Sequence, residues 1–76
     1  MPTPIRTTAD LARAIRERRT ALSLTQADLA ALVGTSVRFI NELERDARGG
    51  AAIERVLLVC ERLGLVVELS LREDAR

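Results

Sequence analysis

The sequence predicts an all-α bundle of four to five helices, followed by one C-terminal β-strand that pairs across a dimer. Apolar residues recur at three- and four-residue spacing, and glycines or helix-capping residues separate the runs, which predicts the helices. The period changes to two after Gly64, which predicts the strand. We therefore divide the chain into an arm over 1–7, a helical domain over 8–64, a dimerisation strand over 65–72 and a tail over 73–76.

Composition limits the functions that are open to this chain. It has 76 residues and a net charge of +1, contains one Phe and no His, Tyr or Trp, and takes every positive side chain from Arg. It offers no metal-ligand cluster and no glycine-rich phosphate loop, so we expect no enzyme, no metal and no cofactor. The single Cys60, the lack of an apolar run near the roughly 20 residues of a membrane span, and the lack of a secretion signal predict a cytoplasmic protein.

The N-terminal part should form an extended arm and a first helix. Pro2 and Pro4 disfavour helix in the residues before them, so the arm is either frayed or touches phosphate through Arg6. Thr8 is a plausible N-cap, and the helix should end near Ser23. Its apolar side is formed by Leu11, Ala14, Ile15 and Leu22. Its polar side includes Arg13 and Arg16, which as a group either are solvated or contact phosphate.

Residues 24–44 read as two short helices that are joined by a tight turn. Thr25 can cap the first helix, with Asp28 three residues later as in a capping box. Gly34 stands where the first helix must stop with a positive φ, and Ser36 can cap the second helix. This is the arrangement of a helix-turn-helix, whose second helix lies in the DNA major groove.

A fourth helix is expected over residues 51–63, and the strand follows it. The apolar stripe of the helix consists of Ile53, Val56, Leu57, Cys60 and Leu63, and Cys60 reads as a small core residue. The apolar face of the strand consists of Leu65, Val67, Leu69 and Leu71. A lone strand leaves its backbone groups unpaired, so we expect it to pair antiparallel with the same strand of a second copy.

Residues 24–45 resemble the helix-turn-helix of the lambda-repressor-like (Xre-type) superfamily. The residues that carry the likeness are Gln26, Ala30, Gly34, Ile40 and Leu43, and Glu44-Arg45 frames them. Residues 11–72 further resemble the HipB-type subgroup, through the run over 38–45 and through Leu63-Gly64-Leu65 before the alternating strand.

The resemblance implies a sequence-specific DNA-binding homodimer that acts as an antitoxin and represses its own operon. Such proteins are encoded beside a HipA-like kinase toxin and act on the bacterial nucleoid. Two alternatives stay open. The chain could be a stand-alone repressor of phage or plasmid type without a toxin, or an interaction protein that only keeps the helix-turn-helix shape.

The resemblance also assigns roles to individual residues. Gln26 would hold a DNA phosphate, and the residues that would read base edges are Ser36, Val37, Arg38 and Asn41. Their chemistry fits, because Arg can bind guanine, Asn can bind adenine and Val can contact a thymine methyl. Arg48 would replace the phosphate-binding residue that the family usually carries after Glu-Arg.

Two interpretations are open for the pair Arg19 and Glu44, and two for Phe39. Arg19 and Glu44 occupy positions that the family joins in a partly buried salt bridge between the first and third helices. Without the resemblance they would be a weak surface pair. Phe39 either packs into the core under the turn or is exposed near the DNA or a partner.

Overall fold

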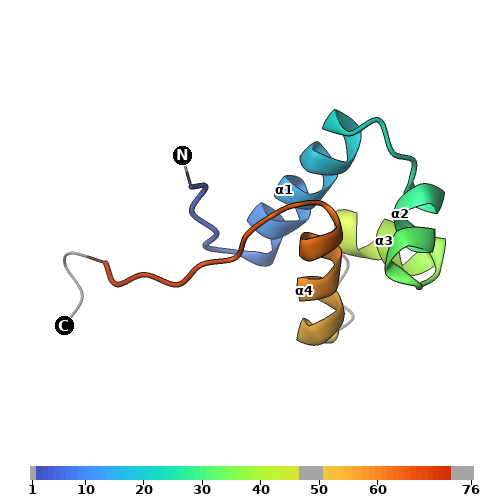
Figure 1. The fold of residues 1–76 in the computed structure, drawn as a ribbon. Coiled ribbons are helices and arrows are strands. Elements are labelled where there is room, and N and C mark those ends of the chain that lie inside the picture. The colour runs from blue at the N-terminus through green and yellow to red at the C-terminus, as the bar shows by residue number, and fades with distance from the viewer. Residues whose placement is uncertain (1, 47–50, 73–76) are drawn as a thin grey trace.

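The computed structural model describes residues 2–46 and 51–72, and within these ranges it contains four helices (Figure 1). They are α1 (Thr8–Ala21), α2 (Gln26–Val33), α3 (Val37–Glu44) and α4 (Ile53–Arg62). The all-helical bundle is therefore confirmed. Residues 65–72 form no strand within the described part of the single chain, so the pairing across a dimer stays a prediction.

A capping box begins α1 at Thr7, so the expected cap at Thr8 was wrong by one residue. The Thr7 hydroxyl accepts from the Asp10 N–H at 3.1 Å, and the Asp10 carboxylate accepts from the Thr7 N–H at 3.2 Å. The reciprocal pair needs the acidic residue three positions after the cap, and only Thr7 has that spacing from Asp10. The helix ends at Ala21 with Leu22 as its C-cap, close to the expected end near Ser23, which adopts a positive φ of 59°.

The turn between α2 and α3 has the structure that the sequence predicts. Thr25 caps α2 by accepting from the Asp28 N–H at 2.9 Å, and Asp28 accepts from the Thr25 N–H at 2.9 Å. Gly34 ends α2 with a φ of 81°, a region that L-residues with a Cβ rarely adopt. Ser36 caps α3 by accepting from the Phe39 N–H at 3.0 Å. These local bonds orient α3 relative to α2.

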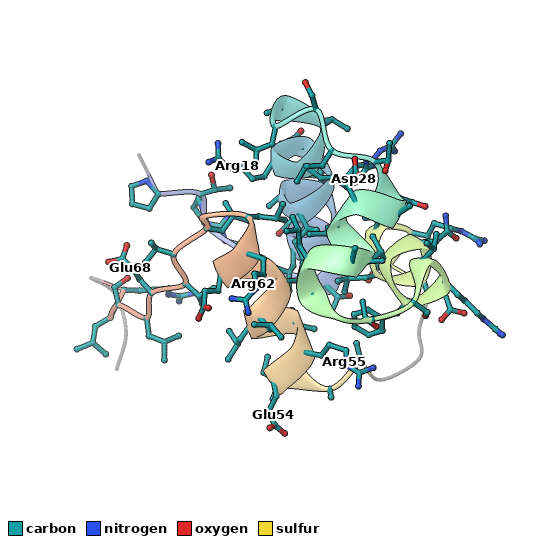
Figure 2. The ribbon with its side chains drawn as sticks, turned by 45° about the vertical axis from the view of Figure 1, so that its right-hand side comes forward. Arg18, Asp28, Glu54, Arg55, Arg62 and Glu68 are labelled. Carbon is teal, nitrogen blue, oxygen red and sulfur yellow. The ribbon has the colours of Figure 1, made fainter. Side chains whose placement is uncertain are left out.

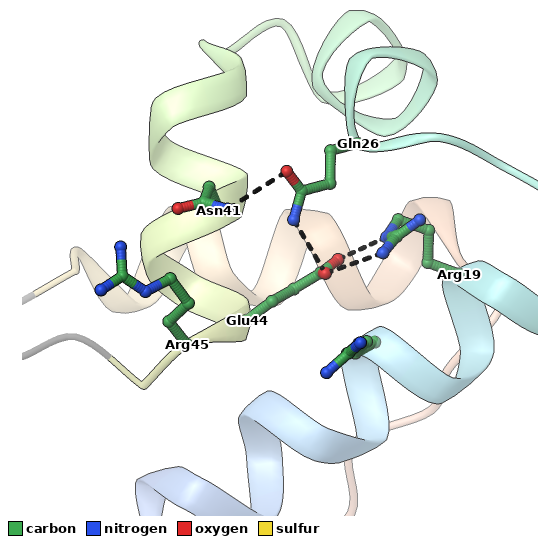
Figure 3. A pocket seen from close by; sticks show the side chains of 6 residues that line it. Arg19, Gln26, Asn41, Glu44 and Arg45 are labelled. Atoms are coloured by element: carbon green, nitrogen blue, oxygen red, sulfur yellow. Dashed lines mark hydrogen bonds and ion pairs between the residues drawn. The ribbon is translucent and has the colours of Figure 1, made fainter.

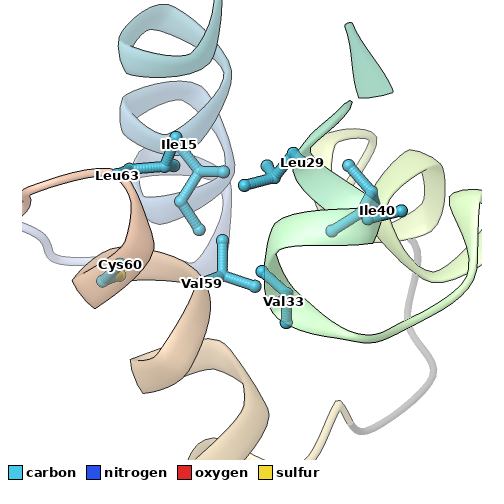
Figure 4. Close-up of a cluster of buried hydrophobic side chains, with 8 residues drawn as sticks. Ile15, Leu29, Val33, Ile40, Val59, Cys60 and Leu63 are labelled. Atoms are coloured by element: carbon cyan, nitrogen blue, oxygen red, sulfur yellow. The ribbon is translucent and has the colours of Figure 1, made fainter. Parts of the chain in front are cut away.

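The four helices enclose one small aliphatic core (Figure 4). Its buried members are Ile15, Leu29, Ala30, Val33, Ile40, Val59, Cys60 and Leu63. Phe39 packs partly against this core, and the guanidinium of Arg55 lies 5.3 Å from the centre of its ring. The core reading of Phe39 is therefore the one that the structure supports.

The predicted apolar stripes of α1 and α4 were partly wrong. On α4, Val59 is fully buried, whereas Ile53 and Leu57 are exposed, because the helix packs through positions 56, 59, 60 and 63. That set follows the i, i+3, i+4, i+7 pattern, and Leu57 lies about 100° around the helix from Val56. On α1, Leu22 is similarly exposed because it lies beyond the end of the helix.

The end of α4 is tied to α1, and the chain then leaves the bundle. Arg18 donates its Nε–H to the Leu63 carbonyl at 2.8 Å, and Gly64 turns the chain with a φ of 75°. Leu65 still packs against the core, but the following residues extend away from the helices (Figure 1). Glu68 on this segment lies well away from Asp28 on α2 (Figure 2).

Candidate nucleic-acid interface

The predicted base-reading residues lie on or next to α3, mostly towards solvent. Ser36 is exposed and caps the helix, Val37 is 46% exposed, and the side chain of Arg38 is 86% exposed. Arg38 forms an ion pair with Glu42 at 3.5 Å, one helical turn along. An exposed pair of this kind contributes little free energy, so Arg38 can exchange it for another acceptor at low cost.

Asn41 is hydrogen-bonded to Gln26, and Gln26 is in turn hydrogen-bonded to Glu44 of a buried ion pair (Figure 3). The Nδ2–H of Asn41 donates to Gln26 Oε1 at 3.4 Å, and Gln26 Nε2–H donates to Glu44 Oε1 at 3.1 Å. The Glu44 carboxylate therefore fixes which end of the Gln26 amide faces Asn41. The predicted phosphate-binding side chain and one predicted base-reading side chain are thus oriented by the same carboxylate.

Arg19 and Glu44 form a bidentate ion pair between α1 and α3. Arg19 Nε lies 2.5 Å from Glu44 Oε2, and Nη2 lies 2.9 Å from Oε1. The side chains are only 12% and 3% exposed, and Arg19 Nη1–H also donates to the Leu24 carbonyl at 2.7 Å. The hydrogen bonding of the Arg19 guanidinium to the Glu44 carboxylate raises the pKa of Arg19. One guanidinium thus joins α1, the chain before α2, and α3.

These side chains border a hollow of about 220 Å³ between α1, α2 and α3. It is lined by Arg16, Arg19, Gln26, Asn41, Glu44 and Arg45. The sequence pattern assigned no role to Arg45, and it left Arg16 undecided between solvation and phosphate contact. Helical spacing carries the missing signal, because Arg16 precedes Arg19 by three residues and Arg45 follows Asn41 by four. Residues at these spacings share one face of a helix.

The residues that were predicted to form the dimer interface lie outside this hollow. Leu65 packs partly against the core of its own chain, whereas Leu69 is 100% and Leu71 93% exposed. Val67 is also exposed. Arg48, the predicted phosphate contact in the connector, lies outside the described residues.

Three other kinds of feature bear on the function of the described part of the chain, namely metal sites, membrane-spanning helices and a reactive thiol. Over residues 2–46 and 51–72, no group of three or more His, Cys, Asp or Glu side chains could hold a metal ion. None of the helices described is both long and apolar enough to cross a membrane. Cys60 is buried, and burial raises the pKa of its thiol, which keeps the sulfur in its unreactive neutral form.

Comparison with known proteins agrees with this geometry. The profile of a helix-turn-helix family matches residues 15–66, which is more than half of the chain. The matched range contains α2, α3, α4 and the second half of α1, and therefore both helices of the turn and the partners that bury them. None of the curated proteins matches the sequence significantly.

Proposed function

Because the chain belongs to the Xre-type helix-turn-helix superfamily of DNA-binding transcriptional regulators, we propose that it is a homodimeric antitoxin that represses its own operon, which also encodes a HipA-like kinase toxin. One observation carries the DNA-binding part of the proposal. The capped helix α3 has a polar, exposed face that begins at Ser36 and includes Arg38. A helix held in this way by a preceding helix is the element that such proteins insert into the major groove.

Base reading follows from the chemistry of that face. The exposed guanidinium of Arg38 can donate to O6 and N7 of guanine, and the amide of Asn41 can bind adenine. Val37, which is half exposed at the start of α3, can contact a thymine methyl. The Gln26 amide, at the N-terminus of α2, can hold a phosphate beside them.

The exposed apolar residues of the C-terminal part support the dimer. Leu69 and Leu71 are almost fully exposed, and Ile53 and Leu57 are exposed one turn apart on α4. On so small a domain, apolar surface of this extent indicates a protein interface. We propose that residues 65–72 of two copies form an antiparallel ribbon that packs over the two α4 helices. The ribbon alone would be marginal, so burial on the helices must supply much of the stability.

The toxin partner is the part of the proposal that rests on sequence likeness to the HipB-type subgroup, namely the run over 38–45 and Leu63-Gly64-Leu65. A stand-alone repressor would share the same DNA-binding face. The two differ in one observable, a stable complex with the product of an adjacent kinase-like reading frame. Co-expression with that product, followed by size-exclusion chromatography, should give a co-migrating complex. Separate elution of the two proteins would leave only the stand-alone repressor.

The DNA-binding part is tested by in vitro selection from a random duplex library. The expected product is an inverted repeat whose half-sites lie about one helical turn apart, roughly 34–36 Å, as two recognition helices of a dimer require. Affinity for the selected duplex should fall steeply with salt, because binding releases counterions from the phosphates. Failure to enrich any sequence, together with an affinity for duplex DNA that does not change with salt, would refute the DNA-binding part of the proposal.

A further inference from the structure

We infer that the hollow between α1, α2 and α3 binds one phosphodiester of the DNA backbone, through Arg16 and Arg45. This inference rests on the proposed DNA-binding function and deepens it. It assigns a phosphate contact to α1, which lies outside the two helices of the helix-turn-helix itself.

Charge is the first argument. The hollow is lined by three arginines and one glutamate, so its net charge is +2. The carboxylate of Glu44 is already neutralised by Arg19 and also accepts from Gln26. Among the described residues, neither Arg16 nor Arg45 has a side-chain hydrogen bond or an ion pair. Two guanidiniums with unused donors therefore border one concave site.

The chemistry of guanidinium selects the ligand. Its planar fork of N–H donors matches the oxygens of a phosphate, and charge-assisted bonds of this type are stronger than neutral ones. Arg16 comes from the middle of α1 and Arg45 from the residue that caps the C-terminus of α3. An anion held between them would be contacted from two sides.

The position of the hollow identifies the phosphate as that of the nucleic acid. Gln26 and Asn41 line the hollow, and both also belong to the predicted DNA-contacting set. A duplex that brings a base edge to Asn41 must bring the adjacent backbone to the same part of the surface. The network through Glu44 holds both amides in place before DNA arrives.

Arg13 offers a matched comparison on the same helix. It lies one turn before Arg16, and its side chain is 65% exposed. It forms an ion pair with Asp10 at 3.7 Å and does not line the hollow. Arg13→Ala and Arg16→Ala therefore remove the same charge from neighbouring turns of α1. Only the second removes a residue of the proposed phosphate site.

The test combines these variants with neutralised phosphates. A duplex selected by the wild-type protein is synthesised as a series, each member carrying one uncharged methylphosphonate. Arg16→Ala and Arg45→Ala should each lower affinity for the unmodified duplex about 10-fold to 100-fold, and each should reduce the slope of log affinity against log salt by about 1. At one phosphate in each half-site, the methylphosphonate should weaken the wild type but not these two variants.

Arg13→Ala is the control for this test. Arg13→Ala should keep the wild-type response at every phosphate, and far-UV circular dichroism should show that all the variants fold. If Arg16→Ala does not fold, Arg16→Gln, which keeps much of the aliphatic stem, replaces it. If no phosphate loses its effect in the Arg16 variant, or if Arg13→Ala behaves identically, this inference is overturned while DNA binding stands. A wild type that binds no duplex would overturn both.

Discussion

The ion pair between Arg19 and Glu44 should dominate the stability of this small domain. Arg19→Met removes three hydrogen bonds of the guanidinium, two to the carboxylate and one to the Leu24 carbonyl. It leaves a carboxylate that is 3% exposed, with Gln26 as its remaining hydrogen-bond donor among the described residues. Removing one partner of a buried pair typically costs about 3–5 kcal/mol. A domain of this length has only about 4–11 kcal/mol in total.

The reverse substitution should cost less. In Glu44→Gln, the guanidinium that remains is 12% exposed and still donates to the Leu24 carbonyl. The control is Glu42→Gln, which breaks the exposed pair with Arg38 and should change the free energy of unfolding by about 0–1 kcal/mol. The expected order of destabilisation is therefore Arg19→Met, then Glu44→Gln, then Glu42→Gln.

Urea denaturation followed by far-UV circular dichroism measures these differences, since the chain has no Trp or Tyr for fluorescence. All variants must be compared at one protein concentration, because the proposed dimer would gain stability by mass action. A double-mutant cycle over Arg19 and Glu44 should give a coupling free energy well above that of an exposed pair. If Arg19→Met stays within about 1 kcal/mol of the wild type, the level of an exposed pair, the pair is not the buried joint that its geometry indicates.

Four further outcomes are expected. Arg38→Ala should cost about 1–3 kcal/mol of DNA-binding free energy and relax specificity at the base pair that Arg38 contacts. An equal loss of affinity for all operator variants would argue against base reading by Arg38. Gly34→Ala should cost about 1 kcal/mol in urea denaturation, because a Cβ meets no atom within 4 Å and only the φ of 81° opposes it. The hydrogen bond from the Thr25 N–H lowers the pKa of Asp28. The ionised carboxylate therefore contributes fully to the stability of the fold above the ordinary aspartate pKa, and this contribution is lost as the pH falls through the lowered value. Asp28→Asn should accordingly flatten the acid limb of the curve of unfolding free energy against pH. Leu69→Pro should yield monomers in sedimentation and weaken operator binding, whereas a dimer with full affinity would refute the ribbon.

Local chemistry made much of the helix-turn-helix readable from the sequence. Thr25, Asp28, Gly34 and Ser36 form caps and a turn with residues at most four positions away, so their spacing alone specifies the structure. The same rule explains the error at α1. Thr7 and Thr8 are both good caps in isolation, and only the reciprocal bond with Asp10 distinguishes them.

Packing decided the rest of the core. The sequence offers two overlapping apolar stripes on α4, one through Ile53 and Leu57 and one through Val56 and Val59. Helical periodicity cannot choose between faces that are both apolar. The choice depends on where α1 and α2 lie, because only one stripe can face the core that they form.

The sequence by itself determined the succession of helices, the sharp turn at Gly34 and the polar character of the face that begins at Ser36. Only the tertiary structure showed that Arg16 lines the hollow with Arg45 and that Arg13, one turn earlier on the same helix, does not. The physical reason is the separation along the chain over which each kind of interaction acts. Caps and periodicity act within a turn or two of helix, whereas a site built from three helices depends on contacts between residues that are 15 to 25 positions apart.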